Sequence, residues 1–413
     1  MDYQESLDYL KILEKLGIKF RLENTRELIS ALGFDYDGLV VHVAGTNGKG
    51  SCAATLASII SCFGKKVGLY TSPELVDFRE RIKVDGVMIS PEKFSEITSN
   101  LKPLIDSMQD KPTFFEATTA LALKHFADEG VDAMVLEAGM GGRLDSTNAI
   151  PGDMSIITNV SLDHMGYLGS TASEIAFEKS GIITPGTCLV TSAKEPGLSV
   201  LHRESIKKKS EIMRLGKEFR ISNVVPTLLE TSFTVETAAD TYILKSPLIG
   251  DFQAENIACA VVAAEKIGIA KDKIVEGVSR TVWQGRMQTV SEKPHIIVDC
   301  AHNPEGFKRT LDFIRHRGKY RKLILVVGFS KDKDYSSMLS HISLSDTIIA
   351  TRYQGERSLS PDKILEHVNG LAYHDLQSAL TYATSTASDK DIILVNGSIY
   401  LAGEALRLFS PTN

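Results

Sequence analysis

Two long stretches of the chain show the same alternation of short apolar runs with helical periods of hydrophobic residues. The first stretch has apolar runs at 39–43, 67–70, 133–138 and 155–160, and helical patterns at 51–63, 116–129 and 172–181. The second stretch has apolar runs at 295–300, 323–328, 347–351 and 391–395, and helical patterns near 304–316, 361–369, 376–385 and 399–408. This alternation predicts an α/β fold in which each stretch forms a largely parallel sheet.

The segment between the two stretches has a different pattern. Residues 218–245 hold three short segments in which apolar and polar side chains alternate, and this predicts a small antiparallel sheet. A helical pattern follows at 254–267, and both patterns are interrupted near 281–289. We therefore expect two domains. The first, 1–283, holds the mostly parallel sheet and the antiparallel patch, and the second, 284–413, is Rossmann-like.

Composition narrows the class of protein. The chain has 413 residues, of which 43% are hydrophobic and 24% charged, as in ordinary globular proteins. The net charge of −6 offers no attraction for nucleic acid, no apolar run has the length of a membrane span, and the N-terminal residues lack the pattern of a signal peptide. Five scattered cysteines without a C-x-x-C spacing fit free thiols in a reducing compartment. We expect a cytoplasmic protein without nucleic-acid or membrane partners.

A glycine-rich segment lies between the first apolar run and the first helical pattern, and it reads Gly45-Thr46-Asn47-Gly48-Lys49-Gly50-Ser51. A turn of this kind points backbone N–H groups at one spot, and the helix dipole and Lys49 add positive charge there. The segment therefore predicts a phosphate-binding loop in which Ser51 contacts the accompanying Mg²⁺. It differs from G-x-x-x-x-G-K-[ST] because Lys49 precedes the last glycine. The alternative is a tight strand–helix turn that binds nothing.

Polar residues follow two further apolar runs of the first stretch. Glu137 lies at the carboxyl end of a predicted parallel strand, where ligand crevices form. Beside a phosphate loop, this position suits a second Mg²⁺ ligand or a carboxylate that orients water. Asp163 and His164 follow another such strand, and the pair suits a metal or phosphate site. The alternatives are a solvent-facing Glu137 and a purely structural His164.

The second stretch carries polar residues at equivalent strand ends. Asn303 and Pro304 are explained as a helix cap and a first helical residue, but Asp299 and His302 are not, and we expect these two to line a crevice. Two other strand ends would line the same crevice, at 328–334 and 396–400. The absence of G-x-G-x-x-G from the sequence argues against a dinucleotide. A nucleotide domain that faces a second substrate domain indicates ligase or kinase chemistry.

Ten short segments, in order along nearly the whole chain, give it a family resemblance. They lie at 70–73, 78–82, 115–116, 137–148, 162–164, 178–182, 253–256, 285–286, 299–304 and 397–401. With the variant phosphate loop, this order resembles the folylpolyglutamate and dihydrofolate synthases, which form the folate branch of the Mur ligase superfamily. Each segment alone is weak evidence, but the ten in order are specific.

The resemblance implies a reaction and a set of roles. ATP phosphorylates a carboxylate of a pterin or folate substrate, and the amino group of L-glutamate then displaces the phosphate to form an amide. The positions that match ATP contacts are Gly45, Thr46, Asn47, Gly48, Lys49, Gly50, Ser51, Asn256, Arg286 and Asp299. Those that match or neighbour two Mg²⁺ ions are Ser51, Ser72, Glu137 and His164. The catalytic set is Lys49, Glu137, His164, Lys179 and His302, and the substrate contacts are Phe115, Asp145, His302 and Ser398.

The resemblance also implies a modification, and it leaves the acceptor open. Lys179, otherwise an ordinary helix lysine, matches a lysine that CO₂ carbamylates, which turns a cation into a carboxylate. Members of the family are usually monomers. The segment Ser72-Pro73-Glu74 departs from the family's frequent Ser-Pro-His. The acceptor is dihydropteroate, tetrahydrofolate or both. The alternative functions are a Mur-type amide ligase with another carboxylate acceptor and a P-loop nucleotide-binding regulator.

Overall fold

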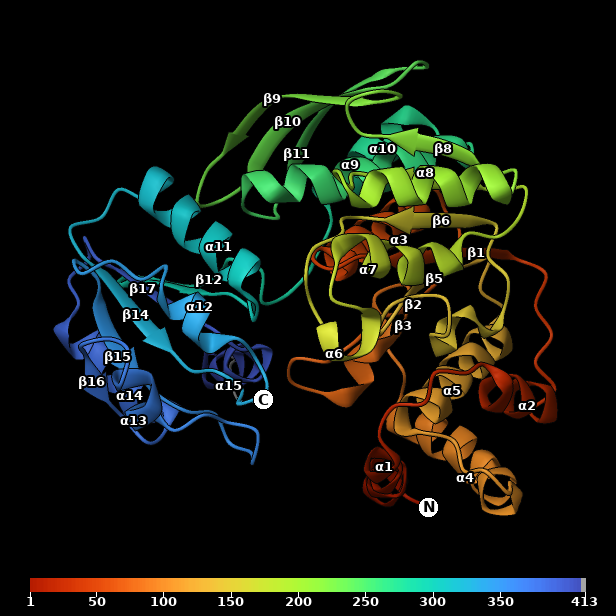
Figure 1. Cartoon of the computed structure of the whole chain (residues 1–413), viewed down its shortest axis with the longest axis horizontal. Helices are drawn as coiled ribbons and strands as arrows, with labels where there is room; N and C mark the ends of the chain where they lie inside the picture. The colour runs from red at the N-terminus through yellow and green to blue at the C-terminus, as the bar shows by residue number, and fades with distance from the viewer. Residues whose placement is uncertain (410–413) are drawn as a thin grey trace.

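An eight-stranded sheet organises the N-terminal part of the computed structural model, which describes residues 1–409 (Figure 1). Its order is β4-β3-β2-β5-β1-β6-β7-β8, and the strands are β1 (Leu39–Ala44), β2 (Val67–Tyr70), β3 (Ile82–Val84), β4 (Val87–Met88), β5 (Ala133–Glu137), β6 (Met154–Ile157), β7 (Cys188–Thr191) and β8 (Glu211–Arg214). In this order, every neighbouring pair along β2-β5-β1-β6-β7-β8 is parallel, and β3 and β4 add an antiparallel edge beside β2. The predicted mostly parallel sheet is confirmed.

Strand β6 ends earlier than the apolar run at 155–160 predicts. The strand stops at Ile157. The hydroxyl of Thr158 donates a hydrogen bond to the carbonyl of Asn47 at 2.7 Å, so the chain turns here toward the phosphate loop instead of continuing the ladder. The shorter strand therefore brings residues 158–164 to the loop.

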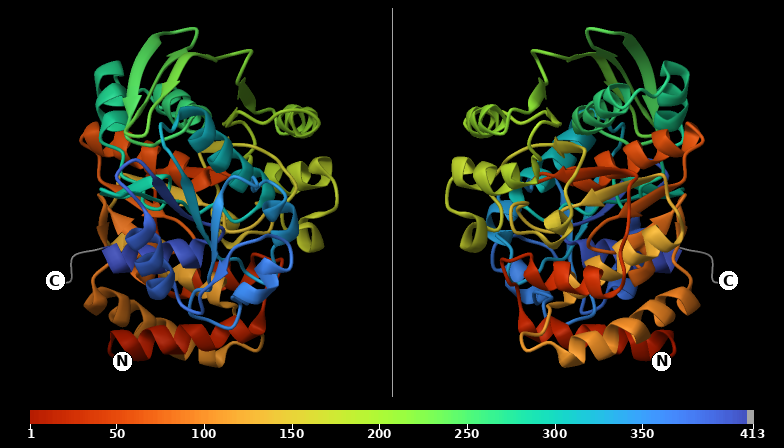
Figure 2. Two further views of the ribbon diagram at one scale, coloured as in Figure 1. Left: turned by 90° about the vertical axis from the view of Figure 1, so that its left-hand side faces the viewer. Right: turned by 90° about the vertical axis from the view of Figure 1, so that its right-hand side faces the viewer.

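Helices cover both faces of this sheet (Figures 1 and 2). One face carries α3 (Lys49–Cys62), α9 (Asp251–Lys266) and α10 (Lys271–Ser279), and the other carries α1 (Tyr3–Ile12), α2 (Glu23–Ala31), α4 (Pro91–Ser107), α5 (Phe114–Asp128), α7 (Ala172–Lys179) and α8 (Gly197–Lys207). The alternation of side chains along β1 explains why both faces are covered. Val41 and Val43 pack in the core with α3 and α9, whereas Val40 packs in the core with α4 and α5. No helix within residues 1–409 is long and apolar enough to cross a membrane.

Short helical turns join these elements near the site. They are η1 (Leu13–Leu16), η2 (Phe78–Arg81), η3 (Ser146–Ala149), α6 (Met165–Leu168) and η4 (Ser180–Ile182). The segment predicted to be antiparallel forms a three-stranded sheet of order β11-β10-β9, with strands β9 (Arg220–Pro226), β10 (Thr231–Glu236) and β11 (Thr241–Ser246). This sheet packs on α9 and α10 and lies at the top of Figure 1. The antiparallel prediction is confirmed.

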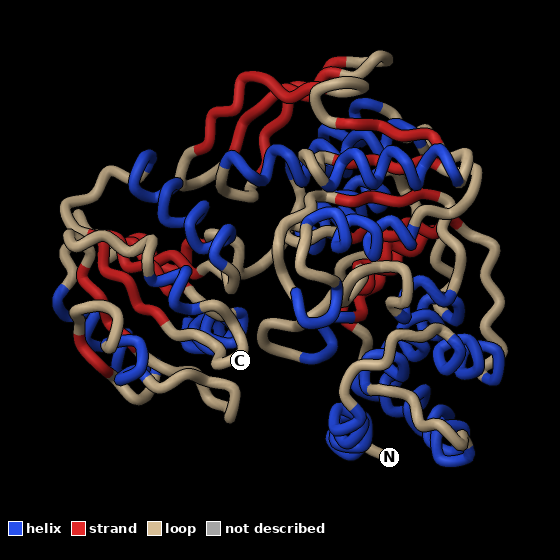
Figure 3. The backbone as a smooth tube through the Cα atoms, in the orientation of Figure 1, coloured by secondary structure: helices blue, strands red, loops and turns tan. Residues whose placement is uncertain are grey.

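A six-stranded sheet organises the C-terminal part, and Figure 3 shows it among its helices. The order is β12-β13-β17-β14-β15-β16, from β12 (Gln288–Glu292), β13 (His295–Val298), β14 (Leu323–Val327), β15 (Thr347–Ala350), β16 (Leu371–Ala372) and β17 (Ile392–Asn396). Its helices are α11 (Pro304–Arg317), α12 (Tyr335–Leu339), α13 (Pro361–Leu365), α14 (Leu376–Thr386) and α15 (Ile399–Phe409). All pairs are parallel except β12–β13. Helix α13 is shorter than the predicted 361–369, and residues 410–413 of the predicted second domain lie outside the described residues.

The two large sheets turn their carboxyl ends toward one another. Asn47, after β1, accepts a hydrogen bond from Nδ2 of Asn303 at 2.8 Å and donates one to Glu305 at 3.3 Å. Lys333, after β14, lies 3.5 Å from the carboxylate of Asp163, after β6. Loops at these strand ends therefore meet across the two parts of the chain, which is where ligand crevices form in parallel sheets.

Candidate active site

The predicted phosphate loop has the geometry of a strand–loop–helix turn. Strand β1 ends at Ala44, and α3 begins at Lys49. Gly48 has a φ of 79°, and a Cβ atom there would collide with the side-chain amide of Asn256. Only glycine meets both conditions at this position. The loop therefore presents bare backbone N–H groups at the N-terminus of a fourteen-residue helix, which is a suitable environment for phosphate.

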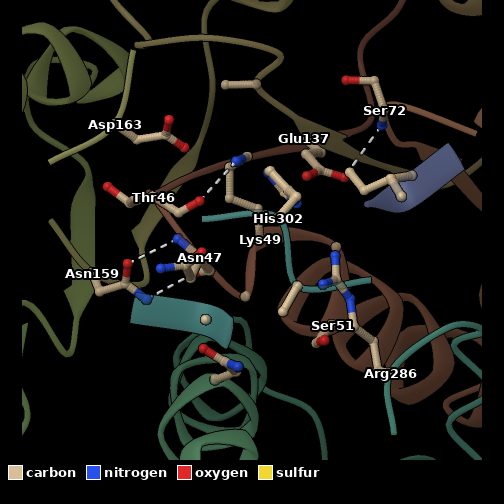
Figure 4. A pocket seen from close by; sticks show the side chains of 18 of the residues that line it. Thr46, Asn47, Lys49, Ser51, Ser72, Glu137, Asn159, Asp163, Arg286 and His302 are labelled. Atoms are coloured by element: carbon tan, nitrogen blue, oxygen red, sulfur yellow. Dashed lines mark hydrogen bonds between the residues drawn. The ribbon is translucent and has the colours of Figure 1, made fainter. Parts of the chain in front are cut away.

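Polar side chains of the loop after β6 fix the shape of the phosphate loop (Figure 4). The backbone N–H of Asn47 donates to Oδ1 of Asn159 at 2.9 Å, and Nδ2 of Asn159 donates to the Asn47 carbonyl at 2.8 Å. The hydroxyl of Thr46 donates to the Ser161 carbonyl at 3.1 Å and accepts from the Ser161 N–H at 3.0 Å. The side chains of Asn159 and Thr46 thus brace the loop.

Two lysine amines lie against the backbone of the loop. Nζ of Lys49 lies 3.4 Å from the carbonyl of Thr46, and Nζ of Lys179 donates to the carbonyl of Gly45 at 2.8 Å. Lys179 is only 3% exposed. Its burial, aided by the neighbouring charge of Lys49, lowers the pKa of Lys179 to about 7. A large fraction of this amine is therefore neutral near pH 7.

A buried carboxylate lies near Lys49, and a buried hydroxyl lies in the first turn of α3 (Figure 4). Glu137, at the end of β5, accepts a hydrogen bond from the N–H of Ser72 at 3.3 Å, and burial raises the pKa of its carboxyl. The hydroxyl of Ser51 is buried and has no hydrogen-bond partner within residues 1–409. Oxygen atoms of these two types are ligands that Mg²⁺ prefers, and an unpartnered buried hydroxyl fits a position beside a cation.

Two histidines lie where the two parts of the chain meet. His164 has a φ of 51° and precedes α6, and its Nε2 lies 3.8 Å from Asp163. Nδ1 of His302 is 3.0 Å from the carbonyl of Cys300, so its proton belongs on that nitrogen and the lone pair is on Nε2. Burial lowers the pKa of His164, and it lowers the pKa of His302 to about 4. Both rings are therefore neutral at pH 7.

No three His, Cys, Asp or Glu side chains within the described part of the chain gather as a ready metal site. A cation at Ser51 and Glu137 would thus depend on ligands from other sources, such as phosphate oxygens.

The first of two cavities follows the phosphate loop into the C-terminal part. It is lined by every residue from Gly45 to Ser51 and by Ser72, Glu137, Asn159, His164, Lys179, Asn256, Arg286, Asp299, His302 and Arg309, among others. The carboxylate of Asp299 is buried and accepts from the N–H groups of Met287 and Ala301 and from the hydroxyl of Thr310. Asp299 therefore joins the turn that carries Arg286 to the loop after β13 and to α11.

The second cavity lies between the two parts of the chain. The N-terminal part contributes Phe115, Leu144, Asp145 and Ser146, and the C-terminal part contributes Ser330, Lys333, Arg357, Ser398 and Tyr400. The carboxylate of Asp145 accepts from the N–H groups of Met140 and Thr147, so this residue shapes the wall. Ser72, Pro73, Gly139, Met140, His164, His302 and Ile399 line both cavities. The two cavities are therefore continuous at the histidines.

All the site residues predicted from the sequence line one of these cavities, but four cationic residues were not assigned a role, and one of them is Lys19, which lines the second cavity. Arg357 lines the second cavity from the loop after β15, and Arg81 lines it from the end of η2. Arg309 of α11 lines the first and pairs with Glu305 at 2.7 Å. Arg357 follows a strand end, so the rule that found His302 could have found it.

Comparison with known proteins identifies similar sequences over the whole chain. Residues 43–264 match the Mur ligase middle domain, and residues 285–399 match the Mur ligase glutamate ligase domain. The dihydrofolate synthase/folylpolyglutamate synthase of Bacillus subtilis is 31% identical over 97% of this chain and 98% of that protein. A probable bifunctional folylpolyglutamate synthase/dihydropteroate synthase of Haloferax volcanii is 35% identical over 98% of this chain, but the chain spans half the length of that protein.

Solved structures with a similar fold carry nucleotides. Escherichia coli FolC in complex with DHPP and ADP superimposes with a TM-score of 0.89, at 30% identity, over 98% of this chain and 97% of that one. Mycobacterium tuberculosis folylpolyglutamate synthase complexed with ADP and AMPPCP superimposes with a TM-score of 0.92, at 28% identity, over all of both chains.

Proposed function

Since the chain belongs to the folylpolyglutamate synthase/dihydrofolate synthase family of Mur ligases, we propose that it is an ATP-dependent ligase that joins L-glutamate to the carboxylate of a folate-type pterin. The observation that carries this proposal is the continuity of the two cavities at His164 and His302. A phosphate loop lines one cavity, and cationic side chains of the C-terminal part line the other. A phosphoryl group and two carboxylate substrates can therefore meet at one point.

The first cavity is suited to ATP. The N–H groups of the loop and the ammonium of Lys49 would bind the β- and γ-phosphates, and Asn256 and Arg286 line the same cavity. Ser51 and Glu137 would hold one Mg²⁺, and Ser72 and His164, which line the same cavity, would contribute to a second. Bound there, the metal would offset the negative charge that develops on the phosphates.

Lys179 is suited to carbamylation. Its amine is buried and has a pKa of about 7, so the neutral form that attacks CO₂ is available near neutral pH. The nitrogen forms a bond to the carbon of CO₂ and loses a proton, which leaves a carbamate anion. This anion would reverse the charge beside Lys49 and supply an oxygen ligand close to the phosphate loop.

The second cavity is suited to the two carboxylate substrates. An acceptor carboxylate placed near the histidines attacks the γ-phosphorus and releases ADP, which gives an acyl phosphate. The amine of L-glutamate then attacks the acyl carbon, phosphate leaves, and the amine loses a proton. The neutral Nε2 of His302 would take that proton, since its Nδ1 is used by the carbonyl of Cys300. Lys333, Arg357 and Ser398 would hold the carboxylates of the incoming glutamate.

The experiment that tests this function is phosphate release from purified protein with Mg·ATP and L-glutamate. Dihydropteroate, tetrahydrofolate and no acceptor are compared in parallel, and the product is identified by mass. We expect release only when glutamate and a pterin are both present. Phosphate release that depends on neither glutamate nor a pterin would instead support a nucleotide-binding regulator.

We also propose that the enzyme acts as a cytoplasmic monomer, since one chain forms both cavities and all five cysteines are free.

A further inference from the structure

An ammonium group of α8 caps the turn that follows Lys179. Helix α7 ends at Lys179, η4 continues the chain, and α7 and α8 lie side by side (Figure 1). Nζ of Lys208, the residue after α8, donates to the carbonyl of Ser180 at 3.1 Å and to that of Ile183 at 2.7 Å. It also donates to the carbonyl of Gly181 at 3.5 Å. One cation from the neighbouring helix therefore binds three carbonyl groups of a single turn.

The carbonyl groups of this turn need such partners because the turn is buried. Ser180 and Ile183 are 2% and 1% exposed. The last carbonyls of a helix have no partner within the helix, and a buried carbonyl left unpaired costs free energy. The hydroxyl of Ser155, on β6, donates to the carbonyl of Ile182 at 2.8 Å. Lys208 serves the neighbouring carbonyls with a charged donor, which forms stronger hydrogen bonds than a neutral one.

The position of the turn determines the position of the Lys179 amine. A Cβ atom at Gly181 would collide with the backbone of Arg143, so the turn also packs closely on the loop after β5. The side chain of Lys179 leaves the chain directly before this turn, and its Nζ reaches the carbonyl of Gly45 at 2.8 Å. Any displacement of the turn would therefore move the amine relative to the phosphate loop.

Lys208 differs from the lysines on either side of it. The side chain of Lys207 is 59% exposed and pairs with Glu204 at 2.8 Å, and Lys209 is exposed. Lys208 is half-buried, and within residues 1–409 its ammonium makes no ion pair, only the three bonds to backbone carbonyls. Removing an ammonium from water is costly unless other groups replace the water. The placement of Lys208 is thus explained by the turn it binds and not by a solvated surface.

We propose that Lys208 is a positioning residue that holds the amine of Lys179 against the phosphate loop for its reaction with CO₂. The inference rests on the proposed carbamylation and extends it to a residue that lines neither cavity. The neutral amine that adds to CO₂ loses one proton to solvent and keeps one N–H, which the carbonyl of Gly45 can accept. Without Lys208, the carbonyl of Ile183 would lose its one partner within residues 1–409, and the turn would shift toward water.

The test measures the carbamate and the rate separately, in wild type, Lys208→Met and Lys208→Arg. Nuclear magnetic resonance of protein in ¹³C-bicarbonate detects the carbamate carbon, and kcat is measured as bicarbonate is varied. Lys207→Met is the matched control, because it removes the adjacent exposed lysine. We expect Lys208→Met to raise the bicarbonate concentration for half-maximal carbamate roughly tenfold or more, as the loss of one charge-assisted hydrogen bond would. Saturating bicarbonate should restore most of its kcat. Lys208→Arg should stay near wild type, and Lys207→Met should match it.

Three outcomes would overturn the inference. Folded Lys208→Met with the bicarbonate dependence of wild type would give Lys208 a role in stability alone, even if its melting temperature fell. A kcat that stays low at saturating bicarbonate would show that the loss does not act through the carbamate. A wild type that ligates glutamate but carries no carbamate would refute the carbamylation as well and leave the ligase function intact.

Two further controls keep these outcomes distinct. If Lys208→Met does not fold, as judged by circular dichroism, Lys208→Gln, which keeps a neutral donor, is measured in its place and the same criteria apply. A wild type that ligates glutamate to no pterin would refute the proposed function itself, whereas the ¹³C signal of each variant would still decide the role of Lys208.

Discussion

The amine of Lys179 lies 2.8 Å from the carbonyl oxygen of Gly45, and this contact ties the end of α7 to the first residue of the phosphate loop. The contact is buried, and burial lowers the pKa of the Lys179 amine to about 7. A group of this kind affects both the chemistry of the site and the stability of the fold.

We predict that stability rises with pH between 7 and 9 more steeply in wild type than in Lys179→Met. The unfolded chain holds a proton on this lysine up to about pH 10, whereas the native chain loses it near pH 7. The unfolded state thus binds more protons in this window, and raising the pH favours the native state by about 2 kcal/mol. Urea unfolding of both proteins in CO₂-free buffer measures the difference, and two parallel pH profiles would contradict it.

Ser51→Ala should separate stability from nucleotide binding. The hydroxyl of Ser51 is buried without a partner, and such a group costs about 1–3 kcal/mol when left unsatisfied. Removing it should leave the apo protein as stable as wild type, or slightly more so. The same change should weaken Mg²⁺-dependent ATP binding, because a metal ligand is lost. Calorimetric unfolding and titration with ATP, with and without Mg²⁺, test both effects. Destabilised apo protein with normal binding would refute the assignment.

Lys49→Ala should lower kcat about 10²–10³-fold or more, because one fixed cation at the phosphates is lost. The protein should stay folded, since Lys49 donates only a 3.4 Å hydrogen bond to a loop carbonyl. Lys65→Ala is a control at an exposed lysine beyond α3. Circular dichroism checks the fold, and product formation measures the rate. Near wild-type turnover by folded Lys49→Ala would exclude this role.

The rate contribution of His302 should not depend on pH between 6 and 9. Its pKa of about 4 keeps the ring neutral throughout this range, so the ring remains a proton acceptor. His302→Gln should therefore lower kcat by a constant factor, on the order of 10²-fold. A pH–rate profile of each protein at saturating substrates tests this. If the ratio of the two rates changed near pH 6.5, His302 would be titrating in the native enzyme.

The parts of the site that could be predicted from the sequence are those whose position follows from the succession of strand, loop and helix along the chain. A glycine-rich turn between β1 and α3, and polar residues such as Glu137 and His302 at strand ends, follow from rules that hold for any parallel sheet. Arg81 could not be assigned in this way. Its place in the second cavity depends on packing against Phe114, which is distant in sequence. The end of β6 was missed for a similar reason, since Thr158 leaves the strand to bond a distant loop.

The hydrogen bonds that Asn47 accepts from Asn303 and donates to Glu305 bear on how such enzymes can be recombined. A chimaera that grafts a foreign C-terminal half onto this N-terminal half would keep the fold of both sheets. It would lose the polar partners of a residue inside the phosphate loop unless the graft carried an equivalent Asn and Glu at the start of its first helix. Exchange of halves between relatives therefore has to preserve the pairing of the glycine-rich loop with the start of α11.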